Sequence, residues 1–93
     1  MNPVEAEMLT YIQRRIDEGA ATVSEDEILA AVVPADHPEY RLRPAYRYGL
    51  TRLRRRRRLG AFPSRDGGMR YYISGFPYED YVYHTRPEPP GDV

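Results

Sequence analysis

Five consecutive arginines, Arg54–Arg58, follow two leucines at helical spacing and precede a segment with the pattern of a β-hairpin. The guanidinium group is a permanent cation whose planar donors pair with phosphate oxygens and with the O6 and N7 acceptors of guanine. A basic helix followed at once by a two-stranded ribbon suits recognition of duplex DNA through one groove and its flanking phosphates. The run therefore predicts a surface that binds a polyanion.

The formal net charge of zero conceals a strong segregation of charge along the chain. Residues 1–40 hold nine acids and two arginines (−7), residues 41–70 hold eleven arginines and one aspartate (+10), and residues 71–93 hold four acids and one arginine (−3). A strongly cationic middle third indicates a polyanionic partner better than the overall charge does. If about six to eight phosphates are neutralised, the affinity for DNA should fall with log salt at a slope of roughly −5 to −7.

Other classes of protein find little support in the sequence. The chain has no cysteine for a disulfide or a thiolate metal site, no apolar stretch long enough to span a membrane, and an acidic N-terminus unlike a signal peptide. It carries no catalytic Ser/His/Asp set, no glycine-rich phosphate loop and no carboxylate–histidine cluster, and His37 and His84 are isolated. We expect a soluble cytoplasmic protein that is not an enzyme and holds no metal or cofactor.

Capping signals predict two helices in the first third of the chain. Asn2-Pro3-Val4-Glu5 opens a helix that ends at Gly19, and Ser24-Glu25-Asp26-Glu27 opens a second that Pro34 ends. Residues 20–23 fit a short edge strand between them.

A third, basic helix is predicted over about 44–56. Pro44 fits only the first turn of a helix, and Leu50 and Leu53 then share a core face with Tyr46. Continuing the helix would direct Arg57 into the core, and burial of an unpaired guanidinium is costly, so the helix must end near Arg56.

The segments on either side of this helix are less regular. The connection 34–43 fits a single helical turn with Tyr40 and Leu42 packed inward. After the helix, residues 59–63 and 69–74 form a hairpin closed by Asp66-Gly67. Beyond it lie an aromatic extension over 78–86, which packs on the domain or on a partner, and a proline-rich, acidic, disordered tail over 87–93.

Two short patterns resemble a known family. The run Leu50-x-x-Leu53-x-x-x-x-Arg58-Leu59, followed by Gly67-Gly68-x-x-Tyr71-Tyr72-Ile73, is similar to the recognition-helix and wing pattern of bacterial and phage winged helix-turn-helix DNA-binding domains, and 22–28 is similar to their strand and second-helix opening.

The resemblance implies an α+β winged-helix domain over 1–77: a three-helix bundle plus a C-terminal β-hairpin wing, with or without a short strand near 20–23. In this family a glycine usually stands at the position of Arg57, where the chain leaves the helix with positive φ. The connection 34–43 is longer than the usual turn, so a true helix-turn-helix remains open.

The outward face of the basic helix and the wing supply the candidate DNA contacts. The base-reading candidates are Tyr48, Thr51, Arg52 and Arg55. The candidates for phosphate contacts are Arg43, Arg47, Arg54, Arg58, Arg65 and Arg70. The tyrosines at 71, 72, 78, 81 and 83 can stack on bases, although packing on the sheet or a protein interface is the commoner use of such residues.

Two hypotheses of different classes follow. In the first, the chain binds double-stranded DNA, specifically or through its backbone, as a small prokaryotic or phage transcription regulator and as a homodimer. In the second, it is a winged-helix adaptor that binds a protein partner, a polymerase or a defence complex, through the basic face or the aromatic tail. The protein-interface candidates are Phe76, Tyr78, Tyr81 and Tyr83.

Overall fold

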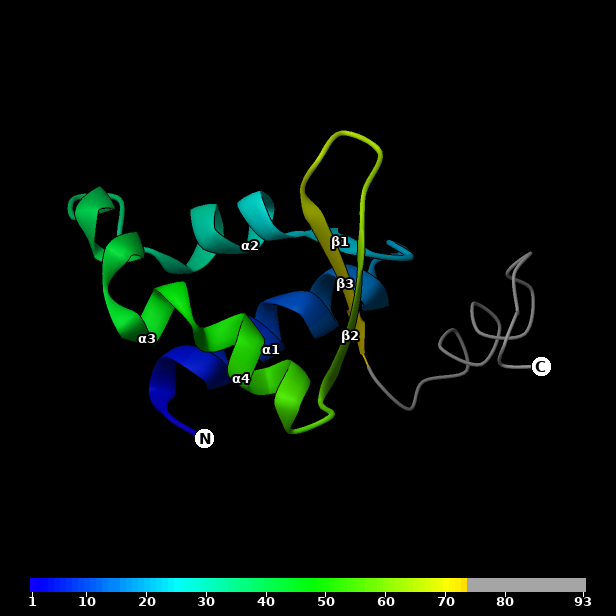
Figure 1. Ribbon diagram of the computed structural model, residues 1–93, viewed down its shortest axis with the longest axis horizontal. Coiled ribbons are helices and arrows are strands. Elements are labelled where there is room, and N and C mark those ends of the chain that lie inside the picture. The colour runs from blue at the N-terminus through cyan, green and yellow to red at the C-terminus, as the bar shows by residue number, and fades with distance from the viewer. Residues whose placement is uncertain (74–93) are drawn as a thin grey trace.

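The computed structural model describes residues 1–73, which form an α+β domain of helices packed against one three-stranded antiparallel sheet (Figure 1). The elements in chain order are α1 (Pro3–Asp17), β1 (Val23–Ser24), α2 (Glu25–Val32), the 3-10 helix η1 (Pro38–Leu42), α3 (Pro44–Arg47), α4 (Gly49–Arg55), β2 (Leu59–Pro63) and β3 (Met69–Ile73). The domain boundary at 77, the extension 78–86, the tail 87–93 and the interface candidates Phe76, Tyr78, Tyr81 and Tyr83 lie outside the described residues. None of the helices in residues 1–73 has the length and apolarity needed to cross a membrane.

Helices α1 and α2 begin as their capping residues predict. The Asn2 side chain accepts a hydrogen bond from the Glu5 backbone N–H at 2.8 Å, and the Ser24 hydroxyl accepts one from the Glu27 N–H at 3.1 Å. These bonds satisfy backbone donors that the first turn of a helix leaves without a partner. Helix α1 ends before Gly19, whose φ of 109° is open to glycine at little cost.

The prediction of one continuous helix over 44–56 is wrong, because the chain breaks at Tyr48. Tyr48 has φ −111° and ψ 6°, and it separates the single turn of α3 from α4. Gly49 then packs directly on α1, where a Cβ atom would lie 2.8 Å from Met8 Sδ. The break lets α4 approach α1 at a residue without a side chain, a requirement that helix propensity alone does not reveal.

The expected inward packing of Leu42 is also wrong, since its side chain is 70% exposed. A 3-10 helix has three residues per turn, so Tyr40 and Leu42, two residues apart, lie on different faces. Tyr40 is half-buried and takes the inner face, where its ring stacks on His37 with centroids 4.7 Å apart.

Helix α4 ends at Arg55, which confirms the prediction that the helix ends near Arg56 and does not direct Arg57 into the core. Arg57 has φ 61°, the left-handed conformation that usually belongs to glycine. The Arg58 N–H bonds to the Leu53 carbonyl at 2.9 Å and the Arg57 N–H to the Arg54 carbonyl at 2.9 Å, which is the paired pattern of a Schellman motif. The turn therefore keeps the Arg57 side chain out of the core at the cost of a strained backbone.

The last two strands form the expected hairpin, and β3 lies in the middle of the sheet order β1-β3-β2. Leu59 pairs with Ile73 and Pro63 with Met69, while Val23 of β1 pairs with Tyr71 on the other edge of β3. The turn closes through a 2.7 Å bond from the Ser64 N–H to the Gly68 carbonyl, and Gly67 has φ 97°.

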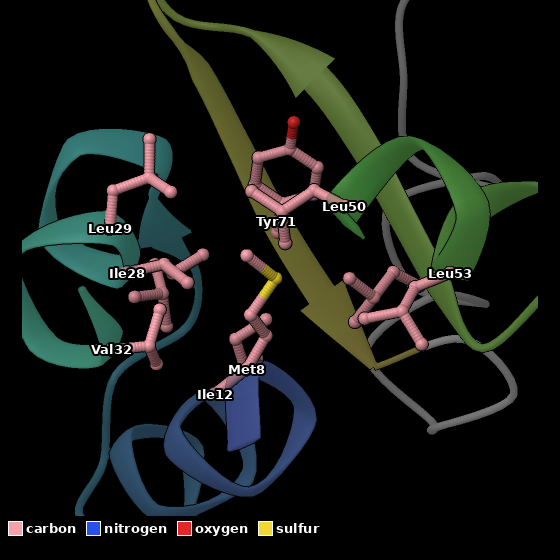
Figure 2. Packing of buried hydrophobic residues seen from close by; sticks show 10 residues of the cluster. Met8, Ile12, Ile28, Leu29, Val32, Leu50, Leu53 and Tyr71 are labelled. Carbon is pink, nitrogen blue, oxygen red and sulfur yellow. The ribbon is translucent and has the colours of Figure 1, made fainter. Parts of the chain in front are cut away.

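The core lies between the helices and one face of the sheet. Figure 2 shows Met8 rising from α1 between Ile28 of α2 and Leu53 of α4, and all three side chains are fully buried. Tyr71 closes the sheet side and is 4% exposed, so it packs in the core and is not available to stack on bases. Burial raises the pKa of its phenol to about 12. The core thus fixes α4 beside the hairpin, which positions the arginines.

Candidate nucleic-acid interface

The arginines of α4 divide between two sides of the helix. Arg52 and Arg56, four residues apart, turn toward α1. Arg54 and Arg55 turn the other way, toward the β2–β3 hairpin. The two pairs have different chemical surroundings, and the uniform run in the sequence therefore separates into a paired and an unpaired group.

The paired group is held by one buried carboxylate. Glu5 is 1% exposed; Arg52 Nε donates to its Oε2, and Arg56 Nη1 donates to its Oε1 at 2.6 Å. Asn2 Nδ2 also donates to Oε2 at 3.2 Å. The hydrogen bond from Arg52 and the charge of Arg56 hold the pKa of the Glu5 carboxyl below its ordinary value, against the effect of burial.

Arg52 has further partners in α3. Its Nη2 donates to the carbonyl of Ala45 at 3.2 Å and approaches that of Pro44 at 3.4 Å. The Pro44 carbonyl also accepts the Tyr48 backbone N–H at 3.1 Å, and the Arg52 guanidinium supplies further donors to α3 in one plane. Arg52 was a base-reading candidate; here its guanidinium joins α4 to both α1 and α3.

The unpaired group lines a hollow between α4 and the hairpin. The hollow has a volume of about 460 Å³ and is lined by Thr51, Arg54, Arg55, Leu59, Gly60, Ala61 and Tyr72. Three DNA-contact candidates, Thr51, Arg54 and Arg55, therefore come together on one wall of the hollow.

The opposite wall depends on a glycine in β2. A Cβ atom on Gly60 would lie 2.5 Å from Tyr72 Cε2, so only glycine lets the Tyr72 ring lie across this strand. Phe62 packs beside that ring, with centroids 6.2 Å apart. The hairpin wall is thus aromatic and apolar, while the α4 wall is cationic.

The remaining candidates fall into two groups. In residues 1–73 the exposed side chains of Arg58 and Arg65 make no hydrogen bond, ion pair or ring contact. The same is true of Arg54 and Arg55, and of Arg57, which was not a candidate. The others have intramolecular contacts: Arg43 lies 3.7 Å over the Tyr40 ring, Arg47 lies 5.4 Å over the ring of the exposed Tyr48, and Arg70 Nε donates to Thr22 Oγ1 at 2.7 Å.

Between α1 and α2, an acidic residue forms an ion pair with an arginine. Glu27 of α2 accepts hydrogen bonds from Tyr11 Oη at 2.6 Å and from Arg15 Nε at 2.5 Å, both on α1. These bonds lower the pKa of the Glu27 carboxyl, and the bond to Glu27 raises the pKa of the Tyr11 phenol. Unpaired positive charge is therefore concentrated around α4 and the hairpin.

Sequence reasoning missed the role of Glu5, which it assigned to helix capping alone. A signal was present: Glu5 precedes Met8 by three residues and Ile12 by seven, so it lies on the core face of α1. A carboxylate in that position needs cationic partners, although the sequence does not say which arginines provide them.

The chain matches none of the protein-family models, curated proteins or solved structures with which it was compared. Function must therefore be inferred from its own residues. Among residues 1–73 no group of three or more histidine or acidic side chains is placed to hold a metal ion.

Proposed function

We propose that the chain is a winged-helix protein that binds double-stranded DNA through α4 and the β2–β3 hairpin, as a small prokaryotic or phage transcription regulator. The order of elements supports this proposal, because α1, β1, α2, the helical segment α3–α4 and a terminal hairpin follow one another as in a winged helix. The sheet order β1-β3-β2 suits the same topology, with β2–β3 as the wing.

One observation carries the proposal: five arginine side chains, gathered around α4 and the hairpin, make no hydrogen bond, ion pair or ring contact in residues 1–73. They are Arg54, Arg55, Arg57, Arg58 and Arg65. The other arginines of residues 1–73 have partners within the domain: Arg15 pairs with Glu27, for example, and Arg43 lies over the Tyr40 ring. Phosphate oxygens are the partners that a cluster of free guanidinium groups suits best.

In the proposed complex α4 faces the major groove and the hairpin follows the neighbouring backbone. Thr51 and Arg55 approach base edges, while Arg54 and Arg58 neutralise phosphates on either side. Arg65, at the tip of the hairpin, reaches the next phosphate or the minor groove. Arg52 can contact a base only by leaving Glu5, so we assign it to the support of α4 instead.

The number of unpaired arginines sets the expected salt dependence. Five phosphate contacts per chain correspond to a slope of about −4 to −5 in log affinity against log salt, shallower than the slope of roughly −5 to −7 expected for about six to eight phosphates. Fluorescence anisotropy of a labelled duplex, titrated with the chain at several salt concentrations, measures this slope.

Matched variants make the titration specific. Arg54→Ala and Arg55→Ala should each reduce the slope by about 0.9, whereas Arg14→Ala, an exposed arginine of α1, should leave it unchanged. Absence of salt-dependent duplex binding, or equal losses in all three variants, would refute the proposal and favour the protein-adaptor alternative.

A further inference from the structure

We propose that Glu5 is a positioning residue for the DNA-binding surface, because it withdraws Arg52 and Arg56 from the polyanion and so restricts phosphate contacts to the hairpin side of α4. This inference rests on the proposed function and adds a residue that would not itself touch DNA. In this proposal the buried carboxylate of Glu5 determines which arginines are available to the nucleic acid.

The geometry of the cluster supports a positioning role. The carboxylate is buried, but its two partners are not: the Arg52 and Arg56 side chains are 31% and 50% exposed. Both guanidinium groups therefore lie at the surface and are held there by contacts to Glu5 from below. Without that anchor, a long arginine side chain at such an exposed position can turn toward solvent or toward a phosphate.

More than one hydrogen bond fixes the orientation of the Arg52 and Arg56 guanidinium groups. Glu5 takes Arg52 at one carboxylate oxygen and Arg56 at the other, and Arg52 is also bonded to the Ala45 carbonyl at 3.2 Å. The carboxylate carries one negative charge against two positive charges, so the cluster keeps a net charge of +1. A phosphate near this side of α4 would thus meet a partly neutralised pair in which Arg52 Nε and Nη2 and Arg56 Nη1 already donate within the domain.

A purely structural role for Glu5 makes a different prediction. If Glu5 only joined α1 to α4, its loss would lower the stability of the fold and leave the number of phosphate contacts unchanged. If Glu5 positions the arginines, its loss adds contacts, so DNA binding becomes tighter and steeper in salt. The salt slope separates the two roles, because it counts phosphates and does not report stability.

The test compares two isosteric substitutions on the same helix. Glu5→Gln removes the buried charge, while Glu7→Gln removes an equal charge from an exposed residue whose side chain makes no hydrogen bond or ion pair in residues 1–73. With a labelled duplex, Glu5→Gln should steepen the slope by about 0.9 for each arginine released. If the affinity at 1 M salt is unchanged, each added contact makes binding at 0.1 M salt about eightfold tighter. Glu7→Gln should change neither quantity beyond the small effect of net charge.

Arg56→Ala identifies the cation responsible and remains informative if Glu5→Gln fails to fold. In the wild-type background Arg56→Ala should leave the slope unchanged, whereas Arg54→Ala lowers it by about 0.9; in the Glu5→Gln background Arg56→Ala should remove one released contact. Equal slopes for Glu5→Gln and Glu7→Gln, or an Arg56→Ala loss as large as that of Arg54→Ala, would overturn the inference while leaving DNA binding itself intact. If the wild-type chain shows no salt-dependent binding, the proposed function fails, and the inference with it.

Discussion

Glu5 and Arg56 are separated by 51 residues in sequence, yet Arg56 Nη1 lies 2.6 Å from Glu5 Oε1. The contact joins the first turn of α1 to the end of α4, at the place where the arginine run leaves the helix. Because Arg52 binds the other oxygen of the same carboxylate, Glu5 together with the buried Leu50 and Leu53 holds the rotation of α4 about its axis. That rotation decides which side chains of α4 face outward.

The first prediction is that Arg52 and Arg54, two residues apart, differ sharply in their effect on stability. Arg52→Ala removes a partner of a buried carboxylate and should lower the free energy of unfolding by about 2 kcal/mol, less than a fully broken buried pair because Arg56 remains. Arg54→Ala, at an exposed side chain without a partner, should change it by no more than about 0.5 kcal/mol. Urea denaturation followed by circular dichroism gives both values; equal effects would contradict the division of the arginines into two groups.

The second prediction concerns acid stability. The pKa values of Glu5 and Glu27 are lowered in the folded chain by hydrogen bonds from Arg52 and from Tyr11, respectively. Near and below their ordinary value of 4.5 the unfolded chain therefore binds more protons than the folded one. The stabilisation is present above that pH and should be lost as the pH falls through the lower, folded values.

Denaturation curves at a series of pH values between about 3 and 7 test this linkage. Glu5→Gln and Glu27→Gln should each flatten the dependence of the unfolding free energy on acid pH. Glu7→Gln is the control and should retain the full dependence. A wild-type stability that is constant through the acid range would show that these carboxylates are not held ionised by their partners.

The elements that depend on local chemistry could be predicted from the sequence. Capping residues identified α1 and α2, and the Asp66-Gly67 turn identified the hairpin. The exit at Arg57 was also predictable, because a guanidinium without a partner is costly to bury at a core-facing helical position.

Features that depend on tertiary contacts could not be predicted in the same way. The break at Tyr48 accompanies the approach of Gly49 to Met8, 41 positions earlier in the chain. Helical spacing grouped Arg52 with Arg55 on the outward face, and it could not reveal that Glu5 of another helix binds Arg52. Candidate arginines can therefore be found from sequence, whereas the division between structural and available ones needs the packed domain.

The third prediction exploits the strained exit from α4. Arg57→Gly should raise the free energy of unfolding by about 1 kcal/mol, because glycine adopts the φ of 61° without the steric penalty of a Cβ atom. Arg57→Ala removes the same charge but keeps the Cβ atom, so it should give no such gain. Comparison of the two variants by thermal and urea denaturation separates backbone strain from charge; an equal gain in both would assign it to relief of repulsion among the arginines.

The fourth prediction tests the close approach of α4 to α1. Gly49→Ala places a methyl group 2.8 Å from the sulfur of the fully buried Met8, so the core must shift, and a loss of about 1 to 2 kcal/mol is expected. Gly68→Ala, at a turn position with open space around it, should stay within about 0.5 kcal/mol of the wild type. Combining Gly49→Ala with Met8→Val, which shortens the obstructing side chain, should cost less than the sum of the two single substitutions.

The fifth prediction separates base reading from backbone contact on the proposed DNA surface. Arg55 is exposed on the α4 wall of the hollow beside Thr51, whereas Arg65 lies on the hairpin turn. If Arg55 forms a bidentate pair with a guanine, Arg55→Ala should relax the preference at one base position by about 1 to 3 kcal/mol. Arg58→Ala and Arg65→Ala should weaken binding to all sequences alike. A selection from randomised duplexes, repeated with each variant, measures the preference at every position. Uniform losses in all three variants would mean that α4 holds the backbone without reading bases, and the chain would then be an architectural DNA binder whose specificity, if any, comes from the shape of the duplex.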